Sequence, residues 1–381
     1  MTAHMTYAEA MVVGLVQGVT ELFPVSSLGH NVLIPALIGG SWAQDLSVSA
    51  PESPYLAFIV GLHVATAAAL ILYFWRDWVR LVGGFLSSLR ERRIATADQR
   101  LAWMIILATI PVGIAGLALE HAFRVVFSKP IPTSLFLALN GVMLLWGERI
   151  RRNRLRALAV PGQVPVPGSV PVPGSVPVSG SVPVSGSGPV PEAGRVSGSG
   201  TVPEATVPEA WPEPGGWPAG QPADPPPVTI DDGREVNPGR DAEIARAIAA
   251  DRRLSAMGYG QAVLIGAAQI GALLPGMSRD GLVTVAGMLR GISREDAVRY
   301  SFLLSAPVIL AAGVLKIPDL TGPLGAGIGG QVIVGSVLSF VGAYLSVRFL
   351  TRYFAKDRPL TPFGIYCLIA GLGSFIYLIA R

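Results

Sequence analysis

The feature that most constrains this chain is a series of long apolar blocks. There are six, at residues 55–75, 101–119, 131–147, 297–317, 328–347 and 361–380. Each is close to the ~20 residues that a helix needs to cross the hydrocarbon core of a bilayer. Because a backbone in lipid must satisfy its own hydrogen bonds, such segments cross as helices. The sequence therefore predicts an all-α integral membrane protein with six spans, rather than a soluble protein with large buried helices.

Charged residues are scarce, and the basic ones gather at particular ends of the blocks. Only 14% of the residues are charged, against about 25% in soluble domains. Lys and Arg cluster at residues 76–100, 149–156, 290–299 and 348–358. Cytoplasmic loops are enriched in these residues, so the four clusters are predicted to face the cytoplasm. Because the clusters lie at helix ends, membrane topology explains them better than binding to nucleic acid.

The segment between the third and fourth blocks has a different composition. Residues 157–240 are rich in Pro, Val, Gly and Ser. Residues 165–188 are four consecutive hexamers, PVPGSV, PVPGSV, PVSGSV and PVSGSG. Proline is kept out of interior strands, so a disordered or polyproline II insert is predicted rather than a β-helix. It follows a basic cluster and is expected in the cytoplasm. The insert separates a first membrane repeat, 1–156, from 241–381, which begins with a predicted amphipathic helix at 241–256.

The two membrane parts are related by a shift of 252 residues. The shift superimposes Gly14, Gln17, Leu22, Ser26 and Gly29 on Gly266, Gln269, Leu274, Ser278 and Gly281. Each copy has a short apolar helix, a proline break, a serine, a second short helix and then three spans. Since three is odd, the copies must have opposite orientations, and such inverted repeats bind ligands near the bilayer midplane. The predicted fold is an inverted repeat in which each half is a re-entrant helical hairpin plus three transmembrane helices.

Polar residues are concentrated at the tip of the first predicted hairpin. Gln17 and Glu21 are four positions apart and share one face of a helix. A carboxylate inside a membrane is costly and indicates a functional site. Ser26 and Ser27 lie where a helix N-cap belongs, and His30 lies in the first turn that follows. For Ser26 capping is the simpler interpretation, whereas Glu21 and His30 together indicate function.

The tip of the second hairpin, PGMSRDGLVT at 275–284, has the features of an anion site. Ser278 can cap the next helix and leave free backbone N–H groups beside Arg279, a combination that binds phosphate. The alternative is that Arg279 only pairs with Asp280 or Glu21. The carboxylate, hydroxyl, imidazole and guanidinium suit phosphoryl transfer. The location favours a lipid phosphate as the substrate.

The motifs QGVTELFPVSSLGH at 17–30 and PGMSRDGLVT resemble the two signature motifs of the bacterial undecaprenyl-diphosphatase family of the bacitracin-resistance type. SFLLSAPVILAAG, at 301–313, is also similar, and the resemblance covers about 7–155 and 255–380. It implies hydrolysis of undecaprenyl diphosphate to undecaprenyl phosphate and inorganic phosphate, which recycles the carrier lipid for cell-wall synthesis and gives bacitracin resistance. The implied site opens to the outer face of the bacterial plasma membrane, and a divalent cation, Mg²⁺ or Ca²⁺, assists.

The resemblance also assigns roles to individual residues. It implies catalytic roles for Glu21, Ser27, His30 and Arg279, and substrate binding by Gln17, Ser26, Ser278, Gly281 and Thr284. Glu21 is also the implied metal residue. The chain departs from the family at Leu28, where Thr is usual, and at Asp280, where Ser is usual. We hypothesise that Asp280 restores a negative charge beside the neutral Gln17 and contributes to metal binding.

Several alternatives stay open at this point. Ser27 is the expected nucleophile, with His30 moving a proton, but a metal-activated water with Ser27 only positioning would serve equally. The rival function is a lipid-phosphate transporter or flippase on the same scaffold. A homodimer also stays open. Asn140 and Glu148, in or beside the blocks, are expected to be structural. His63 is expected to pack within its block with a hydrogen bond, and the alternative that it faces the site stays open.

Overall fold

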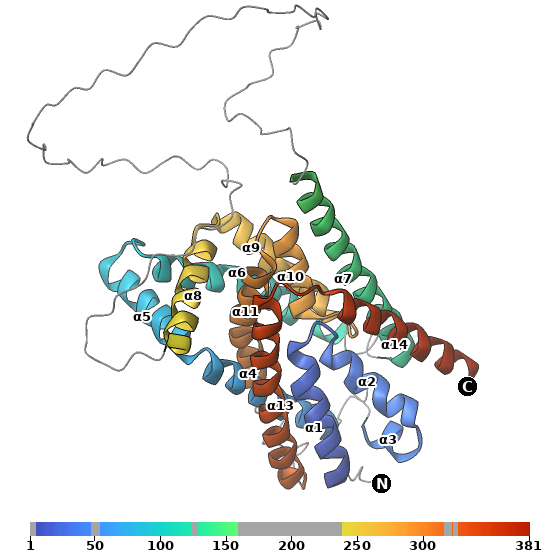
Figure 1. Cartoon of the computed structure of the whole chain (residues 1–381). Coiled ribbons are helices and arrows are strands. Elements are labelled where there is room, and N and C mark those ends of the chain that lie inside the picture. Colours follow the sequence, from blue (N-terminus) through green and yellow to red (C-terminus); the bar gives the residue numbers. More distant parts are fainter. Residues whose placement is uncertain (1–4, 47–53, 123–128, 159–237, 316–321, 323–326) are drawn as a thin grey trace, which may run out of the picture. The chain divides into compact units, whose positions relative to one another are not determined.

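Every regular element that the described residues form in the computed structural model is a helix (Figure 1). The structure describes residues 5–46, 54–122, 129–158, 238–315, 322 and 327–381. The prediction of a disordered insert therefore lies, apart from its ends, outside the described residues. The chain divides into two units, Met1–Val160 with Glu235–Arg381 and Pro161–Arg234, and all contacts below lie within the first.

The helices of the first half are α1 (Tyr7–Leu22), α2 (Ser27–Ile38), α3 (Gly40–Asp45), α4 (Pro54–Tyr73), α5 (Trp75–Glu91), α6 (Ala97–Ala122) and α7 (Pro130–Leu158). Those of the second half are α8 (Pro238–Ser255), α9 (Tyr259–Ala267), the 3-10 helix η2 (Ala268–Leu273), α10 (Arg279–Leu289), α11 (Arg294–Leu315), α13 (Gly329–Ala355) and α14 (Thr361–Ala380). The helix predicted at 241–256 is confirmed as α8.

Five helices in the described part of the chain are long and apolar enough to cross a membrane: α6, α7, α11, α13 and α14. They contain five of the six predicted spans. The remaining block is α4, which turns by 85° into α5, and the second bent pair, α8 with α9 and η2, turns by 102°. Counting each bent pair as a span gives up to seven. The prediction of an all-helical integral membrane protein is confirmed.

Both predicted helix–break–helix elements are present, and local sequence explains why each helix stops. Each break contains a proline, and a serine then caps the next helix: Ser26 accepts from Gly29 N and Ser278 from Gly281 N, at 3.2 Å in each case. Gly276 adopts φ +108°, and a Cβ there would come within 2.5 Å of a carbonyl oxygen of α7. The tip of the second hairpin therefore needs glycine to approach α7.

Each hairpin packs against a long helix of the opposite half of the chain, and small residues form these contacts. A Cβ on Gly14 of α1 would lie 2.4 Å from the carbonyl oxygen of Gly335 in α13, and one on Gly266 of α9 would lie 2.4 Å from that of Ala108 in α6. Such close backbone contact is typical of helices that associate within membranes. Gly14 and Gly266, which the 252-residue shift superimposes, thus have equivalent surroundings. The opposite orientation of the two halves in a membrane stays a prediction.

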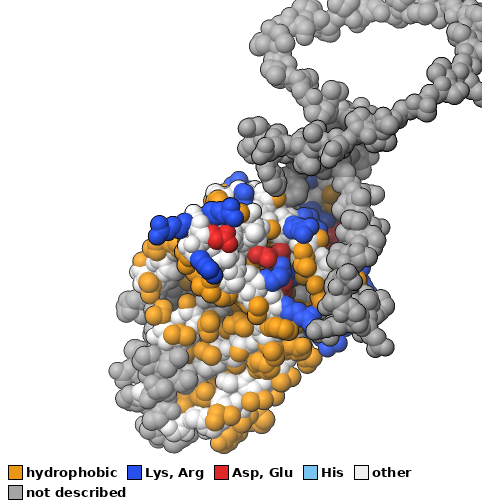
Figure 2. Space-filling view, turned by 90° about the vertical axis from the view of Figure 1, so that its left-hand side faces the viewer, with side chains coloured by type: hydrophobic (Ala, Val, Ile, Leu, Met, Phe, Trp, Pro, Cys, Tyr) orange, Lys and Arg blue, Asp and Glu red, His pale blue; other side chains and the backbone are white. Residues whose placement is uncertain are grey.

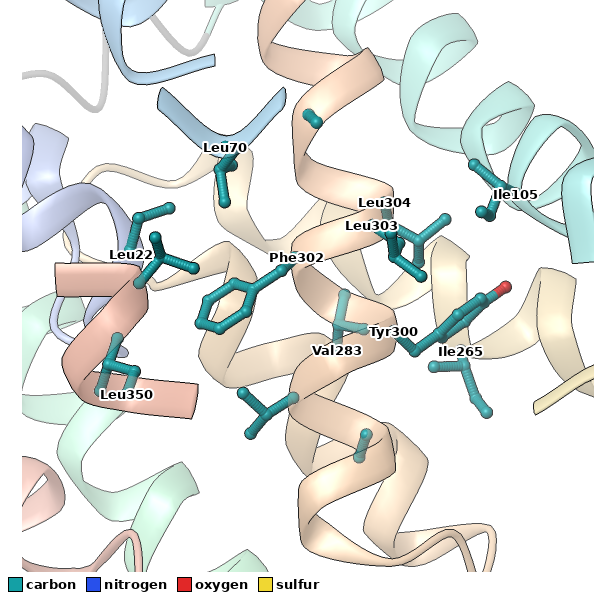
Figure 3. Close-up of a cluster of buried hydrophobic side chains, with 14 of the residues drawn as sticks. Leu22, Leu70, Ile105, Ile265, Val283, Tyr300, Phe302, Leu303, Leu304 and Leu350 are labelled. Atoms are coloured by element: carbon teal, nitrogen blue, oxygen red, sulfur yellow. The ribbon is translucent and has the colours of Figure 1, made fainter. Parts of the chain in front are cut away.

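Helix α11 lies at the centre of the larger apolar core. Figure 3 shows its side chains Tyr300, Phe302, Leu303 and Leu304 pointing toward residues of several other helices, and all four are buried. The surrounding side chains are Leu22 of α1, Leu70 of α4, Ile105 of α6, Ile265 of α9, Val283 of α10 and Leu350 of α13. Helix α11 therefore packs against helices of both hairpins.

A buried ion pair holds the N-terminal end of α11, where the helix begins at Arg294. Arg294 is 2% exposed and donates to Glu148 of α7 at 2.6 Å and to Asp357, between α13 and α14, at 2.7 Å. Glu148 also accepts from the backbone N–H of Leu360 at 3.2 Å. The structural role expected for Glu148 is confirmed, because its carboxylate joins three segments of the chain.

Removing this guanidinium should destabilise the protein strongly. Arg294→Met would leave the Glu148 carboxylate buried and uncompensated, so we expect the free energy of unfolding to fall by about 3–5 kcal/mol. Thermal unfolding in detergent would measure the change. The matched control is Arg93→Met, which breaks an exposed pair with Glu91 and should cost about 0–1 kcal/mol. Equal losses in the two variants would contradict this account of the Arg294 pair.

Candidate active site

The carboxylate of Glu21 is where the two hairpins meet. Glu21 is buried in the last turn of α1, and both of its oxygens are engaged. Oε1 accepts from Nη2 of Arg279, while Oε2 accepts from Oγ of Ser27 and from Nε2 of Gln17 at 2.9 Å. The structure therefore brings together four predicted site residues, of which Glu21 and Arg279 lie 258 positions apart in the sequence.

The local folding of the two breaks explains this convergence. Ser27 is the first residue of α2 and Arg279 the first residue of α10, and the 252-residue shift superimposes one on the other. Two helix N-termini are therefore brought to one carboxylate, each adding a hydroxyl or a guanidinium. Helix N-termini favour anions. The Nε of Arg279 is buried and has no partner among the described residues, so this guanidinium has a donor to spare.

Gln17 holds the carboxylate in place. Its Nε2 donates to Glu21, and its Oε1 accepts from Nδ2 of Asn31 at 2.6 Å. The carbonyl oxygen of Asn31 in turn accepts from the hydroxyl of Tyr55 at 3.1 Å. Both ends of the Gln17 amide are thus satisfied by protein groups, which favours an orienting role. The predicted contact of Gln17 with substrate stays a prediction, and the sequence had not indicated Asn31.

His63 of α4 also belongs to this group of residues. Its Nε2 lies 3.6 Å from Oε2 of Glu21, and its side chain is 27% exposed. Its Nδ1 forms the expected structural hydrogen bond, to the carbonyl oxygen of Ile59 at 2.9 Å. The contact with Glu21 supports the alternative that His63 faces the site, while the expected hydrogen bond is also present. The available signal was that His63 is the one strongly polar side chain in its apolar block.

His30 is held by different partners. Its Nδ1 lies 2.6 Å from the carbonyl oxygen of Ser26, and its Nε2 lies 2.8 Å from the hydroxyl of Tyr366 in α14. The two rings are stacked, with centroids 5.7 Å apart. Both nitrogens of this buried imidazole are thus engaged. Tyr366 is a second residue that sequence reasoning missed, because a tyrosine in an apolar helix resembles a residue that only faces lipid.

Asn140 of α7 connects the two hairpin tips directly. Its Nδ2 donates to the carbonyl oxygen of Pro24 at 3.0 Å, and its Oδ1 accepts from the backbone N–H of Ser278 at 3.0 Å. It is fully buried, and Cys367 of α14 packs beside it. A structural role was expected for Asn140. The contacts sharpen that expectation, because this side chain aligns the break after α1 with the start of α10.

Comparison with known families identifies this arrangement. Residues 10–164 and 241–373 match the family described as bacitracin resistance protein BacA. These segments include both hairpin tips and all the residues described above as partners of Glu21. The chain belongs to the BacA family. The resemblance seen in the sequence motifs is therefore confirmed.

Relatives within the BacA family match along almost the whole chain. The chain is 52% identical, over the full length of both proteins, to a protein of Mycolicibacterium paratuberculosis named undecaprenyl-diphosphatase. It is 50% identical to undecaprenyl-diphosphatase 1 of Frankia casuarinae, over 96% of each chain. Identity is 32% to undecaprenyl-diphosphatase 2 of Chromobacterium violaceum, over 98% of this chain and 99% of the relative.

Three further predicted residues of this BacA family member, Asp280, Gly281 and Thr284, lie in the first two turns of α10. The Asp280 carboxylate accepts from Oγ of Ser305 in α11 at 2.6 Å, and its second oxygen has no hydrogen-bond partner among the described residues. With Thr284 and Ser301 it lines a cavity of about 10 Å³, enough for one water. The side chain of Asp280 is therefore directed toward α11. The backbone N–H of Gly281 donates to the capping hydroxyl of Ser278. The substrate roles of Gly281 and Thr284 stay predictions.

The donor set at Glu21 fits one mode of divalent cation binding. Among the described residues, no three His, Cys, Asp or Glu side chains lie close enough to hold a metal ion. Mg²⁺ is often held by only one or two carboxylates together with substrate phosphates and waters. Both oxygens of Glu21 already accept from protein groups, so its role as such a single ligand stays a prediction. The Ser305 contact of Asp280 does not support its hypothesised role as a second ligand, although no observation tests that role.

Proposed function

We propose that this membrane protein hydrolyses undecaprenyl diphosphate to undecaprenyl phosphate and inorganic phosphate. The convergence of both hairpin tips on Glu21 carries the proposal, because it unites a carboxylate, a hydroxyl and a guanidinium at two helix N-termini. The names of relatives that are 50–52% identical support the substrate. The product is the carrier lipid used again in cell-wall synthesis, and depletion of the diphosphate accounts for bacitracin resistance.

Each site residue has its own role in the proposed hydrolysis. Arg279 and the N-termini of α2 and α10 bind the diphosphate oxygens, and the spare Nε–H of Arg279 gains a partner. Ser27 Oγ attacks the terminal phosphorus while its proton passes to Oε2 of Glu21. The bond to the bridging oxygen breaks, and undecaprenyl phosphate leaves with that electron pair. A water then hydrolyses the phosphoserine, which releases inorganic phosphate and restores the serine. A divalent cation, when bound, offsets phosphate charge.

Phosphate release from a long-chain prenyl diphosphate by the purified protein tests the function. We expect release by the wild type, a phosphoserine at Ser27 in rapidly quenched samples, and a loss of about 10³-fold or more in kcat for Ser27→Ala. An active Ser27→Ala without a trapped intermediate would instead support attack by a metal-activated water. No release in either the Mg²⁺-loaded or the metal-free form would favour a transporter or flippase.

The orientation in the membrane is part of the proposal. The protein is a multi-pass protein of the bacterial plasma membrane, and we place its site toward the outer face and its insert in the cytoplasm. Figure 2 supports this placement, since Lys and Arg gather at one end of the face shown, above a broad band of hydrophobic side chains. Basic residues of this kind mark cytoplasmic helix ends. The homodimer stays a prediction.

A further inference from the structure

The partners of His30 determine which ring nitrogen carries the proton. The carbonyl oxygen of Ser26 can only accept, so the proton of the neutral ring must be on Nδ1. Nε2 then has a lone pair, which accepts from the hydroxyl of Tyr366. The Ser26 contact thus selects the tautomer of His30 in which Nε2 is unprotonated, and the hydroxyl of Tyr366 adds a hydrogen bond to that nitrogen. Free imidazole has no such constraint, so the selection comes from the surrounding protein.

The backbone of Ser26, whose carbonyl oxygen contacts His30, has an unusual conformation. Ser26 has φ +71° and ψ 102°, a conformation that non-glycine residues rarely adopt. Its side chain caps α2 through Gly29, while its carbonyl oxygen faces the imidazole. Strained residues of this kind cluster at functional sites, where the surrounding structure compels them. The strain at Ser26 thus coincides with the group that fixes the His30 tautomer.

Tyr366 is anchored so that its hydroxyl stays on the imidazole. Its ring is stacked on that of His30 with an angle of 4° between the planes. The preceding turn of α14 packs tightly on α7, where a Cβ on Gly141 would lie 2.6 Å from the carbonyl oxygen of Gly364. The other edge of Tyr366 is on the surface, and the residue is 48% exposed. A tyrosine needed only as a lipid-facing group would not need its hydroxyl directed inward.

We propose that Tyr366 is a positioning residue that fixes the ring plane of His30 through its stacked ring and its hydroxyl at Nε2. The inference rests on the proposed function and adds to it a role for His30, which lies one helical turn from Ser27 on α2 and would move a proton or stabilise the transition state. Without the Tyr366 hydroxyl, the imidazole keeps its Nδ1 contact but can turn away from the position that the hydroxyl maintains. Groups that orient metal-bound imidazoles contribute about 10–100-fold in activity, and we expect an effect of that order here.

Tyr366→Phe tests the proposal, because it keeps the stacked ring and removes only the hydroxyl. We expect kcat to fall about 10-fold or more while KM changes less than about twofold, since the diphosphate contacts of Arg279 are untouched. Tyr377→Phe is the matched control. Tyr377 lies on the same helix and is 46% exposed, and its variant should keep the wild-type kcat.

A spectroscopic measurement separates loss of the Nε2 hydrogen bond from a general loss of structure. The chain has four histidines, so ¹⁵N-histidine spectra of the protein in nanodiscs can be assigned by comparison with His30→Gln. We expect the Nδ1-protonated neutral form of His30 in the wild type, in Tyr377→Phe and in Tyr366→Phe, because the Ser26 carbonyl oxygen is unchanged. The Nε2 resonance should shift only in Tyr366→Phe, where this nitrogen loses its hydrogen-bond donor.

The outcomes distinguish this inference from the proposed function. Wild-type kcat in Tyr366→Phe, or an unchanged His30 spectrum, would overturn the positioning role even if the enzyme is a diphosphatase. A fully active His30→Gln would instead remove His30 from the mechanism. Absence of phosphate release by the wild type would overturn the function, although the measurement on Nε2 would still stand. Combining Tyr366→Phe with His30→Gln should cost no more than His30→Gln alone.

Discussion

Replacement of Glu21 with glutamine should reduce the rate of phosphate release by about 10²–10⁴-fold. The glutamine has nearly the same shape, but it cannot take the proton that Ser27 gives up. It also loses the negative charge that faces Arg279, so the guanidinium is left without its counter-ion in a buried site. The measurement is kcat with a long-chain prenyl diphosphate, together with the thermal unfolding midpoint of each variant.

A control on the same helix separates chemistry from stability. Glu9 is also buried in α1, where its carboxylate accepts from the backbone N–H of Thr6 at 2.7 Å in a capping box. Glu9→Gln should weaken the start of α1 and lower the unfolding midpoint, yet leave kcat within about twofold because Glu9 does not contact the site. If Glu21→Gln and Glu9→Gln have similar kcat values, Glu21 is not the group that accepts the Ser27 proton.

A further substitution, Glu21→Asp, tests whether the position of the carboxylate matters as well as its charge. Aspartate keeps the carboxylate but shortens the side chain by one methylene. It can then no longer reach Ser27, Gln17 and Arg279 at the same time. We expect a rate between those of the wild type and Glu21→Gln. A Glu21→Asp enzyme as active as the wild type would show that the distances at this carboxylate do not limit the reaction.

The parts of the fold that sequence reasoning predicted are those governed by local rules. Long apolar blocks must be helices because lipid offers no partners for backbone groups. A proline followed by a capping serine ends one helix and begins another, which located both breaks and placed Ser27 and Arg279 at helix starts. The 252-residue shift then indicated that the two tips belong together, and the contacts of Glu21 confirm this.

The parts that sequence reasoning missed depend on which helices are neighbours. His63 and Asn140 are each one polar side chain in an apolar block, and nothing local says whether such a group faces a site or only packs. Asp280 follows Arg279 directly, but adjacent residues on a helix point about 100° apart. One side chain therefore reaches Glu21 while the other reaches Ser305. Tyr366 becomes informative only when α14 is seen beside α2.

Asn140→Leu is also expected to lower the catalytic rate strongly, because this side chain joins the two hairpin tips. Leucine is similar in size but removes the hydrogen bonds of the amide, so the carbonyl oxygen of Pro24 and the N–H of Ser278 become buried without this partner. Each unsatisfied group costs about 1–3 kcal/mol, and the tips can relieve that cost only by moving apart. A shift of about 1 Å in catalytic groups can cost on the order of 10²-fold in rate.

The control for Asn140→Leu is Ser134→Ala on the same helix. Ser134 is also fully buried, but its hydroxyl donates to the carbonyl oxygen of Ile131 within the same turn of α7. Both variants should lower the unfolding midpoint, and only Asn140→Leu should lower kcat by about 10²-fold. Wild-type kcat in Asn140→Leu would mean that helix packing alone aligns the tips. In that case the close contacts of Gly14 and Gly266 with the opposite halves, rather than the Asn140 bridge, would be what brings Ser27 and Arg279 to Glu21.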